Sequence, residues 1–345
     1  MKIAVDCRMS GKSGIGAFID GILPYLKSSG HELFCFGGNE ENQCDVKTFS
    51  LREIFIFPKK LLGKINDCDV YLTPYCNVPG GIKIPVYTTI HDVVFLDIKG
   101  LAGPLGVFAR KLFYLRAVFR SKGIFTVSYF SRDRIEKNLR CRKPIHVVYS
   151  ANPSFLETPT SIEKKENTII FIGNIKKHKG LSVLLKAVKK MIVETKEDYS
   201  LQIVGSQDNF RTQDNSIGSA IDELNRIHPG SVVFTGFVSD EKLKELLSKS
   251  KLLVQPSFYE GFGLPPLQAL TNGTNALISD IPVFKEIYSS YPVYFFETGN
   301  PDDLFEKMIK ILRENPPVQE FKNIYSFKNT SEKIIMQFEK DMGNL

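Results

Sequence analysis

A chain of 345 residues with 43% hydrophobic and 24% charged residues is long enough for two ordinary domains. That composition excludes a disordered, collagen-like or coiled-coil protein. The net charge of +7 is uneven, because residues 1–155 hold 22 Lys and Arg against 13 Asp and Glu, whereas the remainder holds 23 against 25. Asp6 interrupts the apolar start too early for a signal peptide, no apolar run suits a membrane span, and none of the six cysteines forms a CxxC pair. We therefore expect a cytoplasmic protein.

The first half of the chain alternates short apolar runs with helical patterns. Six runs are typical of β-strands: residues 3–5, 32–36, 70–73, 86–90, 124–127 and 146–149. Between the first run and a helix expected to begin near Ala17 lie Gly11, Gly14 and Gly16. Their spacing matches neither a GxGxxG nor a Walker motif, so a phosphate-binding loop and a simple tight turn are equal alternatives.

Most of the positive charge lies between residues 99 and 143, where twelve basic residues accompany two acidic ones. Residues 101–120 mix bulky apolar side chains with four cations: Arg110, Lys111, Arg116 and Arg120. An interfacial membrane helix and a helix packed on a sheet with a solvated basic face both produce this pattern, which does not separate them. No nucleic-acid-binding motif occurs, and we expect no nucleic-acid partner.

A polar stretch at residues 152–167 is typical of a linker. The alternation then restarts with strands predicted at residues 168–172, 201–204, 232–235, 252–254 and 276–278 and helices near 180–195, 217–227, 240–249 and 302–314. We predict two doubly wound α/β domains, 1–158 and 159–330, and a C-terminal helix at 331–345 that crosses back to the first domain. Ligands of such sheets bind beyond the carboxyl ends of the strands, so the expected site is the interdomain cleft.

The most specific segment is residues 255–270, a strand end followed by a glycine-rich turn and a helix. Gly261 and Gly263 let the backbone approach a ligand closely, and Pro265 suits the first turn of a helix. The unpaired amides of that turn favour a phosphate. Glu260 precedes the turn and is expected to accept hydrogen bonds from sugar hydroxyls beside a bound diphosphate.

This segment closely resembles the C-terminal signature of the family four glycosyltransferases, which are retaining enzymes with the GT-B fold of two facing Rossmann-like domains. The resemblance covers nearly the whole chain. It includes residues 6–8 with 14–16, 89–92, 126–131, 171–180, 235–240 and 300–304.

The resemblance implies roles for individual residues of the second domain. Lys179 matches the lysine that binds the donor diphosphate, and the companion arginine of the family falls near Asn174, so that Lys176 or Lys177 is the candidate for the missing charge. Glu260 is the first acid of the family's E-x7-E pair, but the second position holds Gln268. An amide oxygen still accepts a hydrogen bond from ribose, although without charge.

The remaining donor contacts are expected from the backbone of Gly261, Phe262, Gly263 and Leu264 and from the loop containing Gly14 and Gly16. His91 follows a predicted strand and matches the family histidine that lies near the transferred sugar. The resemblance therefore implies that His91, Glu260 and Lys179 form the catalytic set.

Asp67-Cys-Asp69 imitates a metal-binding DxD motif. Because it leads directly into a predicted strand, a helix-capping or strand-initiating role is the better interpretation. Nothing matches zinc-ligand spacing, and a mechanism without metal or cofactor is expected.

We therefore predict a retaining hexosyltransferase of bacterial surface polysaccharide synthesis that uses a nucleotide-diphosphate sugar and a saccharide or lipid-linked acceptor. The basic first domain suggests peripheral contact with an anionic membrane at its inner face. The alternative, prompted by Asn174 and Gln268, is a nucleotide-sugar-binding partner subunit with little or no catalysis.

Overall fold

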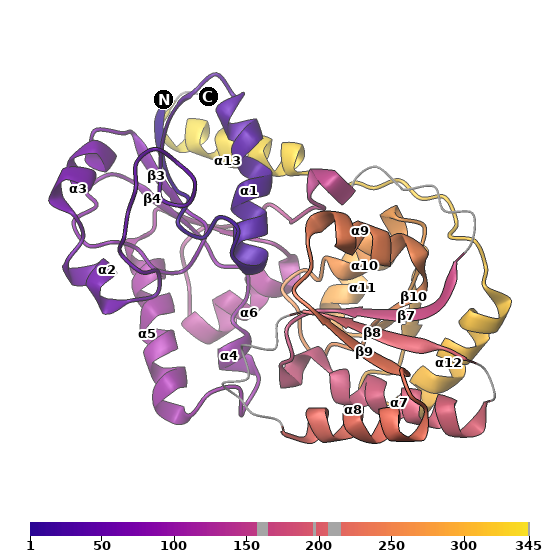
Figure 1. The fold of residues 1–345 in the computed structure, drawn as a ribbon. Coiled ribbons are helices and arrows are strands. Elements are labelled where there is room, and N and C mark those ends of the chain that lie inside the picture. Colours follow the sequence, from indigo (N-terminus) through magenta and orange to yellow (C-terminus); the bar gives the residue numbers. More distant parts are fainter. Residues whose placement is uncertain (157–164, 196–197, 206–214, 344–345) are drawn as a thin grey trace. The chain divides into compact units, whose positions relative to one another are not determined.

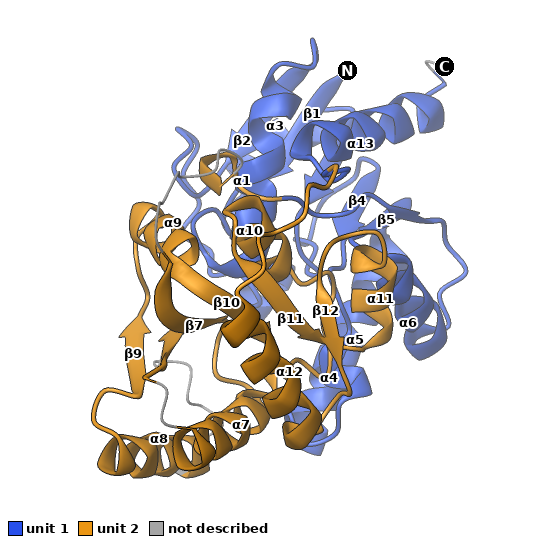
Figure 2. Cartoon of the chain, turned by 90° about the vertical axis from the view of Figure 1, so that its right-hand side faces the viewer, with its two compact units in different colours: residues 1–151, 323–345 blue, residues 152–322 orange. Residues whose placement is uncertain are grey.

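The computed structural model describes residues 1–156, 165–195, 198–205 and 215–343 (Figure 1). The chain forms two compact units, unit 1 of residues 1–151 and 323–345 and unit 2 of residues 152–322 (Figure 2). The domain boundary predicted at residues 158 and 159 lies outside the described residues, as does most of the predicted linker.

Unit 1 is built on a six-stranded parallel sheet in the order β2-β1-β3-β4-β5-β6. Its strands are β1 (Lys2–Asp6), β2 (Glu32–Phe36), β3 (Val70–Thr73), β4 (Val86–Thr89), β5 (Gly123–Thr126) and β6 (Ile145–Val147). The order reverses between β1 and β3, as in other doubly wound sheets. All residues of β3, β4 and β5 are buried, which explains why they read as continuous apolar runs rather than alternating ones.

The helices of unit 1 flank this sheet (Figure 1). They are α1 (Ser13–Lys27), α2 (Leu51–Phe55), α3 (Lys59–Asn66), α4 (Val94–Asp97), α5 (Pro104–Arg120), α6 (Tyr129–Leu139) and α13 (Phe327–Asp341). The predicted start of the first helix near Ala17 is wrong by one turn, since α1 begins at Ser13. Two glycines at the start of a helix lower its intrinsic propensity, which is why the pattern alone misplaced this boundary.

The C-terminal helix α13 belongs to unit 1 (Figure 2). The ring of Phe338 lies 4.6 Å from the ring of Tyr87 on β4, and the Tyr87 hydroxyl donates to Asp341 at 2.6 Å. A side chain at Gly21 of α1 would collide with the ring of Phe327, 2.2 Å from its ideal Cβ. Close packing of α13 on α1 therefore depends on a glycine.

Unit 2 repeats the architecture with the parallel order β12-β11-β10-β7-β8-β9. The strands are β7 (Glu166–Ile172), β8 (Ser200–Val204), β9 (Val232–Gly236), β10 (Ser250–Gln255), β11 (Asn275–Ser279) and β12 (Tyr294–Phe296). The five strands predicted here are present, and the three-residue edge strand β12 was missed because it is too short to show a period.

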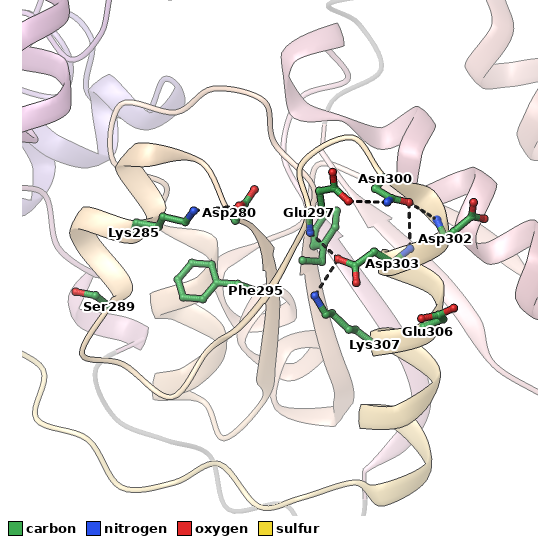
Figure 3. Close-up of a pocket in the computed structure, with 11 residues that line it drawn as sticks. Asp280, Lys285, Ser289, Phe295, Glu297, Asn300, Asp302, Asp303, Glu306 and Lys307 are labelled. Carbon is green, nitrogen blue, oxygen red and sulfur yellow. Dashed lines mark hydrogen bonds and ion pairs between the residues drawn. The ribbon is translucent and has the colours of Figure 1, made fainter.

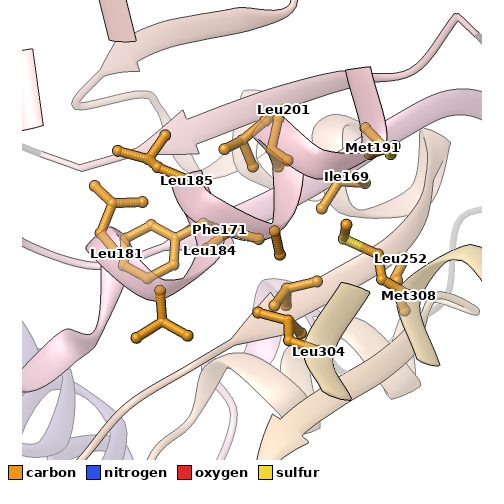
Figure 4. Packing of buried hydrophobic residues seen from close by; sticks show 14 of the residues in the cluster. Ile169, Phe171, Leu181, Leu184, Leu185, Met191, Leu201, Leu252, Leu304 and Met308 are labelled. Atoms are coloured by element: carbon orange, nitrogen blue, oxygen red, sulfur yellow. The ribbon is translucent and has the colours of Figure 1, made fainter. Parts of the chain in front are cut away.

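The core of unit 2 lies between its sheet and the helices α7 and α12 (Figure 4). Phe171 of β7, Leu184 of α7 and Leu304 of α12 are fully buried in it. The helices are α7 (Leu181–Glu194), α8 (Asn215–Ile227), α9 (Asp240–Lys249), α10 (Pro265–Thr271), α11 (Pro282–Tyr288) and α12 (Pro301–Glu314), with short 3-10 turns η1 (Ser154–Leu156) and η2 (Lys177–Lys179). In the described part of the chain, no helix combines the length and apolarity that crossing a membrane requires.

Candidate active site

The strand order of unit 2 reverses between β7 and β10, which are hydrogen-bonded neighbours. From β7 the chain moves outward through β8 and β9, and it then returns to start β10 on the other side. At such a switch point the two following connections diverge and leave a crevice at the carboxyl edge of the sheet. Lys179 follows β7 and Glu260 follows β10, so two of the three predicted catalytic residues meet here.

Lys179 and Glu260 form an ion pair. The Lys179 ammonium lies 2.8 Å from Oε1 and 2.7 Å from Oε2 of the carboxylate. The lysine side chain is 22% exposed and the glutamate side chain 8%. The pair is thus set into the surface with the cation on the more open side, where an incoming anion could replace part of its contact with Glu260.

The Glu260 carboxylate is further held by residues that sequence analysis did not assign. Ser257 donates its hydroxyl to Oε1 at 2.8 Å, and the Gln255 amide donates to the Ser257 hydroxyl at 3.1 Å. Both residues precede Glu260 in the glycine-rich segment already described. The sequence shows this position, but it does not show that the two side chains point toward the carboxylate. This chain of hydrogen bonds fixes the carboxylate before any ligand arrives.

The two loops at the switch point pack directly on each other. The backbone amide of Phe258 donates to the carbonyl of His178 at 2.7 Å. Gly180 has a φ of 69°, and a Cβ there would lie 1.9 Å from the Pro256 carbonyl oxygen. Only glycine satisfies both conditions. The glycine that ends the Lys-Lys-His-Lys-Gly run therefore brings Lys179 against the loop of Glu260.

His178 lies beside the ion pair but is buried. Burial, reinforced by the positive charge of Lys179, lowers the pKa of its imidazole to about 4. His178 is therefore neutral at physiological pH, and Lys179 supplies the positive charge next to Glu260.

The glycine-rich turn leads into α10 as predicted. Gly263 has a φ of 82°, and a Cβ at this position would lie 2.3 Å from the Phe284 ring. The buried Tyr288 hydroxyl donates to the Gly263 carbonyl at 2.5 Å and accepts from the Leu267 amide at 3.3 Å. This tyrosine, for which the sequence held no signal, holds the turn and the helix together.

Other predicted donor residues lie on the same two connections. Gly261, Phe262 and Leu264 belong to the turn before α10, and the buried Gln268 is on α10 itself. Asn174 and Lys176 lie between β7 and η2. All predicted donor residues of unit 2 therefore belong to the connections that leave β7 and β10.

The third predicted catalytic residue, His91, lies in unit 1 just beyond β4. Its Nε2 is 2.9 Å from the carbonyl oxygen of Pro74, and its ring meets Phe18 edge-on at 5.0 Å. A carbonyl can only accept, so Nε2 carries the proton and Nδ1 is left as an acceptor. Burial lowers the pKa of His91 to about 4, which keeps the ring neutral.

Gly14 and Gly16 lie in the first turn of α1, not in a loop before it. A Cβ on Gly16 would lie 2.3 Å from the Met9 carbonyl oxygen, whereas Gly14 is exposed with nothing within 4 Å of its ideal Cβ. Asp20 of α1 accepts from the Ser10 hydroxyl at 2.6 Å and the Gly11 amide at 2.9 Å. The connection between β1 and α1 is therefore held by its own hydrogen bonds and close contacts. Gly14 is an exposed position within it that a ligand could approach.

Comparison with known proteins identifies the family of the chain. The family model described as glycosyl transferases group 1 matches residues 155–325, which contain Lys179 and Glu260. The O-antigen chain mannosyltransferase RfbU of Salmonella typhimurium is 30% identical over 275 residues, covering 74% of this chain and 73% of RfbU. The chain belongs to the group 1 glycosyl transferases.

Solved structures show the fold of this glycosyltransferase. WaaG, a glycosyltransferase involved in lipopolysaccharide biosynthesis, superposes with a TM-score of 0.71 at 15% identity, covering 99% of this chain and 98% of WaaG. Anabaena HepE in complex with UDP-glucose gives 0.65 at 13% identity over 100% of each chain. The predicted GT-B fold of two Rossmann-like domains is confirmed.

Two motifs of the resemblance have structural roles in this glycosyltransferase. Arg8 is buried after β1, where its guanidinium binds Asp6 at 2.6 Å, Glu53 at 2.5 Å and the Tyr75 hydroxyl at 2.6 Å. Asn300 caps α12 by accepting from the amides of Asp302 and Asp303 at 3.0 and 3.1 Å. Neither motif needs a ligand to explain it.

A pocket borders β12 and α12 (Figure 3). Its charged lining is mainly acidic and consists of Asp280, Glu297, Asp302, Asp303 and Glu306 with the cations Lys285 and Lys307. Lys307 and Lys285 are already paired with Asp303 and Asp280 at 2.9 and 3.0 Å. Such a surface repels a diphosphate, so it is not the donor site.

The Asp67-Cys-Asp69 segment has a structural role. Asp69 accepts the backbone amide of Lys2 at 2.7 Å at the start of β1, and Asp67 ends α3. Within the described residues, the group whose atoms lie close enough to hold a metal ion is Cys7, Cys35 and Glu40, and Glu40 is already paired with Lys27 at 3.0 Å.

Proposed function

We propose that this glycosyltransferase moves a hexose from a nucleotide-diphosphate sugar to a hydroxyl of a saccharide or lipid-linked acceptor, with retention at the anomeric carbon and without a metal or cofactor. The observation that carries the proposal is the Lys179–Glu260 pair at the switch point of unit 2. This position combines a cation for a diphosphate with a carboxylate for sugar hydroxyls.

The charge of Lys179 suits the cleavage of the bond between the sugar and the phosphate. When the bond between the anomeric carbon and the phosphate oxygen breaks, the bonding pair stays on that oxygen and the nucleoside diphosphate gains negative charge. A fixed ammonium and the backbone amides after Glu260 would meet this charge without reorganisation. A preorganised donor of this kind typically lowers the barrier by about 3 kcal/mol.

The acceptor hydroxyl completes the reaction. Its oxygen bonds to the anomeric carbon on the face from which the diphosphate leaves, and its proton passes to a diphosphate oxygen. Glu260 is already oriented by Ser257 and would accept hydrogen bonds from the donor sugar. Nδ1 of the neutral His91 would accept a further hydrogen bond from a sugar hydroxyl near the reacting centre.

The names of the relatives suggest which donor sugar and which acceptor to test first. RfbU is named as an O-antigen chain mannosyltransferase, which supports mannose as the first donor sugar to test and a growing surface polysaccharide as the acceptor. We also propose that the protein works at the cytoplasmic face of an anionic membrane, where its basic unit 1 makes peripheral contact.

A binding subunit without catalysis is the less favoured alternative. It rests on Gln268 and Asn174, but Lys179 and Glu260 are both present and paired. If donor turnover appeared only in Gln268→Glu, the alternative would gain; turnover by the wild type excludes it.

The decisive experiment is a nucleotide panel followed by turnover. Uridine and guanosine diphosphate should raise the melting temperature, because a ligand bound to the native state stabilises it. Release of nucleotide from the matching mannose or glucose donor should persist in excess EDTA. Lys179→Met should lower its rate about 100-fold or more. Lys189→Met, which removes an exposed lysine paired with Glu223 at 2.7 Å in the same unit, should leave the rate unchanged. Inhibition by EDTA would refute the metal-free mechanism.

A further inference from the structure

Helix α5 carries an exposed apolar stripe. It consists of Leu105, Phe108, Leu112, Leu115 and Phe119, which recur at spacings of three and four residues and therefore share one face. Leu105 is 85% exposed, Phe108 61% and Phe119 78%. Soluble proteins rarely leave such a contiguous apolar surface uncovered.

The opposite face of α5 is firmly attached to unit 1. Tyr114, Ala117 and Val118 are buried. Arg116 donates to the carbonyl of Val78, and Arg120 donates to the carbonyl of Ile82 at 2.5 Å. The helix thus has a defined inner face, and the stripe is a persistent feature of its outer face.

Helix α2 and the residue after it carry further exposed apolar side chains. Leu51 and Phe55, together with the following Ile56, are exposed. The connection from residue 78 to residue 82, which holds α5, also holds α2, since the amide of Gly80 donates to the carbonyl of Glu53 at 3.1 Å. Both helices lie in the same part of unit 1 (Figure 1). We call the exposed apolar residues of the two segments the α2–α5 surface.

The charges around the α2–α5 surface have one sign. Residues 46–66 and 98–132 contain a single acidic residue, Glu53, which is buried and bound to Arg8. The exposed cations of these segments include Arg52, Lys59, Lys60, Arg110 and Lys111. Apolar side chains framed by cations are the combination with which interfacial helices bind anionic lipid.

A second copy of the chain is the other apolar partner to consider. Two copies joined through α5 would bring Lys111, which adjoins Leu112 and Leu115 of the stripe, near Lys111 of the other copy, and like charges at close range oppose association. Anionic headgroups offer the complementary charge instead.

We propose that the α2–α5 surface docks this glycosyltransferase on an anionic lipid bilayer, with the α5 stripe inserted at the level of the headgroups. The docking proposal rests on the proposed function, which includes peripheral contact with a membrane. It adds the surface that makes this contact. Docking on the bilayer would bring the enzyme to a lipid-linked acceptor that is concentrated there. A soluble acceptor would not require such docking.

The test is vesicle flotation of the full chain. The wild type should float with vesicles of phosphatidylcholine containing about one third phosphatidylglycerol and remain unbound with phosphatidylcholine alone, and raised salt should weaken binding because exposed charges are then screened. Phe108→Ser/Leu112→Ser/Phe119→Ser should reduce binding at least tenfold. A control that removes three exposed apolar side chains elsewhere, Val193→Ser/Ile227→Ser/Met336→Ser, should bind as the wild type does.

Two results would overturn the docking proposal. One is absence of binding to anionic vesicles at low salt, and the other is equal binding by the α5 triple variant. A concentration-dependent dimer that the triple variant loses would assign the surface to a second copy. Nucleotide-induced thermal stabilisation, measured on the same variants, separates the two proposals: if it persists without vesicle binding, only docking fails, and if vesicles bind a protein with no donor turnover, only the transfer reaction fails.

Discussion

Unit 1 and unit 2 each place a cation in the connection that follows the first strand of a doubly wound sheet, and the two cations differ in how completely their partners enclose them. Arg8 follows β1 and is 3% exposed, with Asp6, Glu53 and Tyr75 bound to its guanidinium. Lys179 follows β7, is 22% exposed and binds one carboxylate. The same topological position thus serves as an internal brace in one unit and as an open ion pair in the other.

The difference lies in remaining hydrogen-bonding capacity. Burial opposes the charge of Arg8, but the adjacent Asp6 raises the guanidinium pKa above its usual value, so the charge persists inside the protein. Two carboxylates and a phenol occupy its donors. Lys179 has three N–H donors and faces solvent, and an ammonium of this kind can turn toward a ligand. Arg8 is structural because its partners occupy its donors, whereas Lys179 belongs to the candidate site because it can still bind a ligand.

The largest expected effect is on stability. Arg8→Met leaves Asp6 and Glu53 buried without their cation, and breaking such a buried pair typically costs about 3 to 5 kcal/mol. The free energy of unfolding, measured by urea denaturation, should fall by this amount. Lys27→Met, which breaks the more exposed pair with Glu40, should cost less than about 1 kcal/mol. Equal losses in the two variants would show that Arg8 is not an internal brace of unit 1.

Next in size is the loss of transfer in Lys179→Met. Removing the ammonium should lower the turnover number by about 100-fold or more, corresponding to about 3 kcal/mol of barrier. Single-turnover nucleotide release measures this. The melting temperature should fall less than in Arg8→Met, because Lys179 is partly exposed and because a single buried carboxylate, Glu260, loses its cation while it keeps the hydrogen bond from Ser257. A variant that lost stability instead of turnover would make the second pair a brace like the first.

A smaller effect depends on pH. The pKa of His178 is lowered to about 4 in the folded protein from an ordinary value near 6.5, so the unfolded chain binds more protons between these values. His178 therefore stabilises the fold fully above pH 6.5, and this contribution is lost as pH falls toward 4. Between pH 7 and pH 5 the loss is about 2 kcal/mol.

Chemical denaturation at the two pH values tests this dependence. When the pH is lowered from 7 to 5, the free energy of unfolding should fall less in His178→Asn than in the wild type. The difference between the two losses should be about 2 kcal/mol. An unchanged pH dependence in the variant would mean that His178 is not held neutral and that the charge beside Glu260 is shared.

The smallest expected change concerns nucleotide affinity. Gln268→Glu adds a charged acceptor where the family's second acid stands, and a charge-assisted hydrogen bond to ribose should tighten nucleoside diphosphate binding about tenfold. Calorimetric titration would measure it, with Gln268→Met as the matched loss of the acceptor. Identical affinities in all three proteins would place ribose elsewhere.

Much of the fold followed from local patterns. Eleven apolar runs predicted strands, and each is present in its sheet, because buried parallel strands are nearly continuous in apolar character. The short edge strand β12 and the start of α1 at Ser13 were missed or misplaced, since three residues show no period and two glycines disguise a helical turn. The strand β12 is defined by its pairing with β11, which the local pattern does not show.

The sequence by itself determined the class of the protein: alternating strands and helices, a glycine-rich turn before α10, and a lysine and an acid whose order along the chain resembles a glycosyltransferase family. Only the tertiary structure decided which of these groups act together. Lys179 and Glu260 are 81 residues apart, and they meet because β7 and β10 pair at a reversal of strand order. Tertiary packing likewise buried Arg8, left Lys179 partly exposed and left the α5 stripe exposed. Solvent access is a property of the packed chain and not of any local pattern.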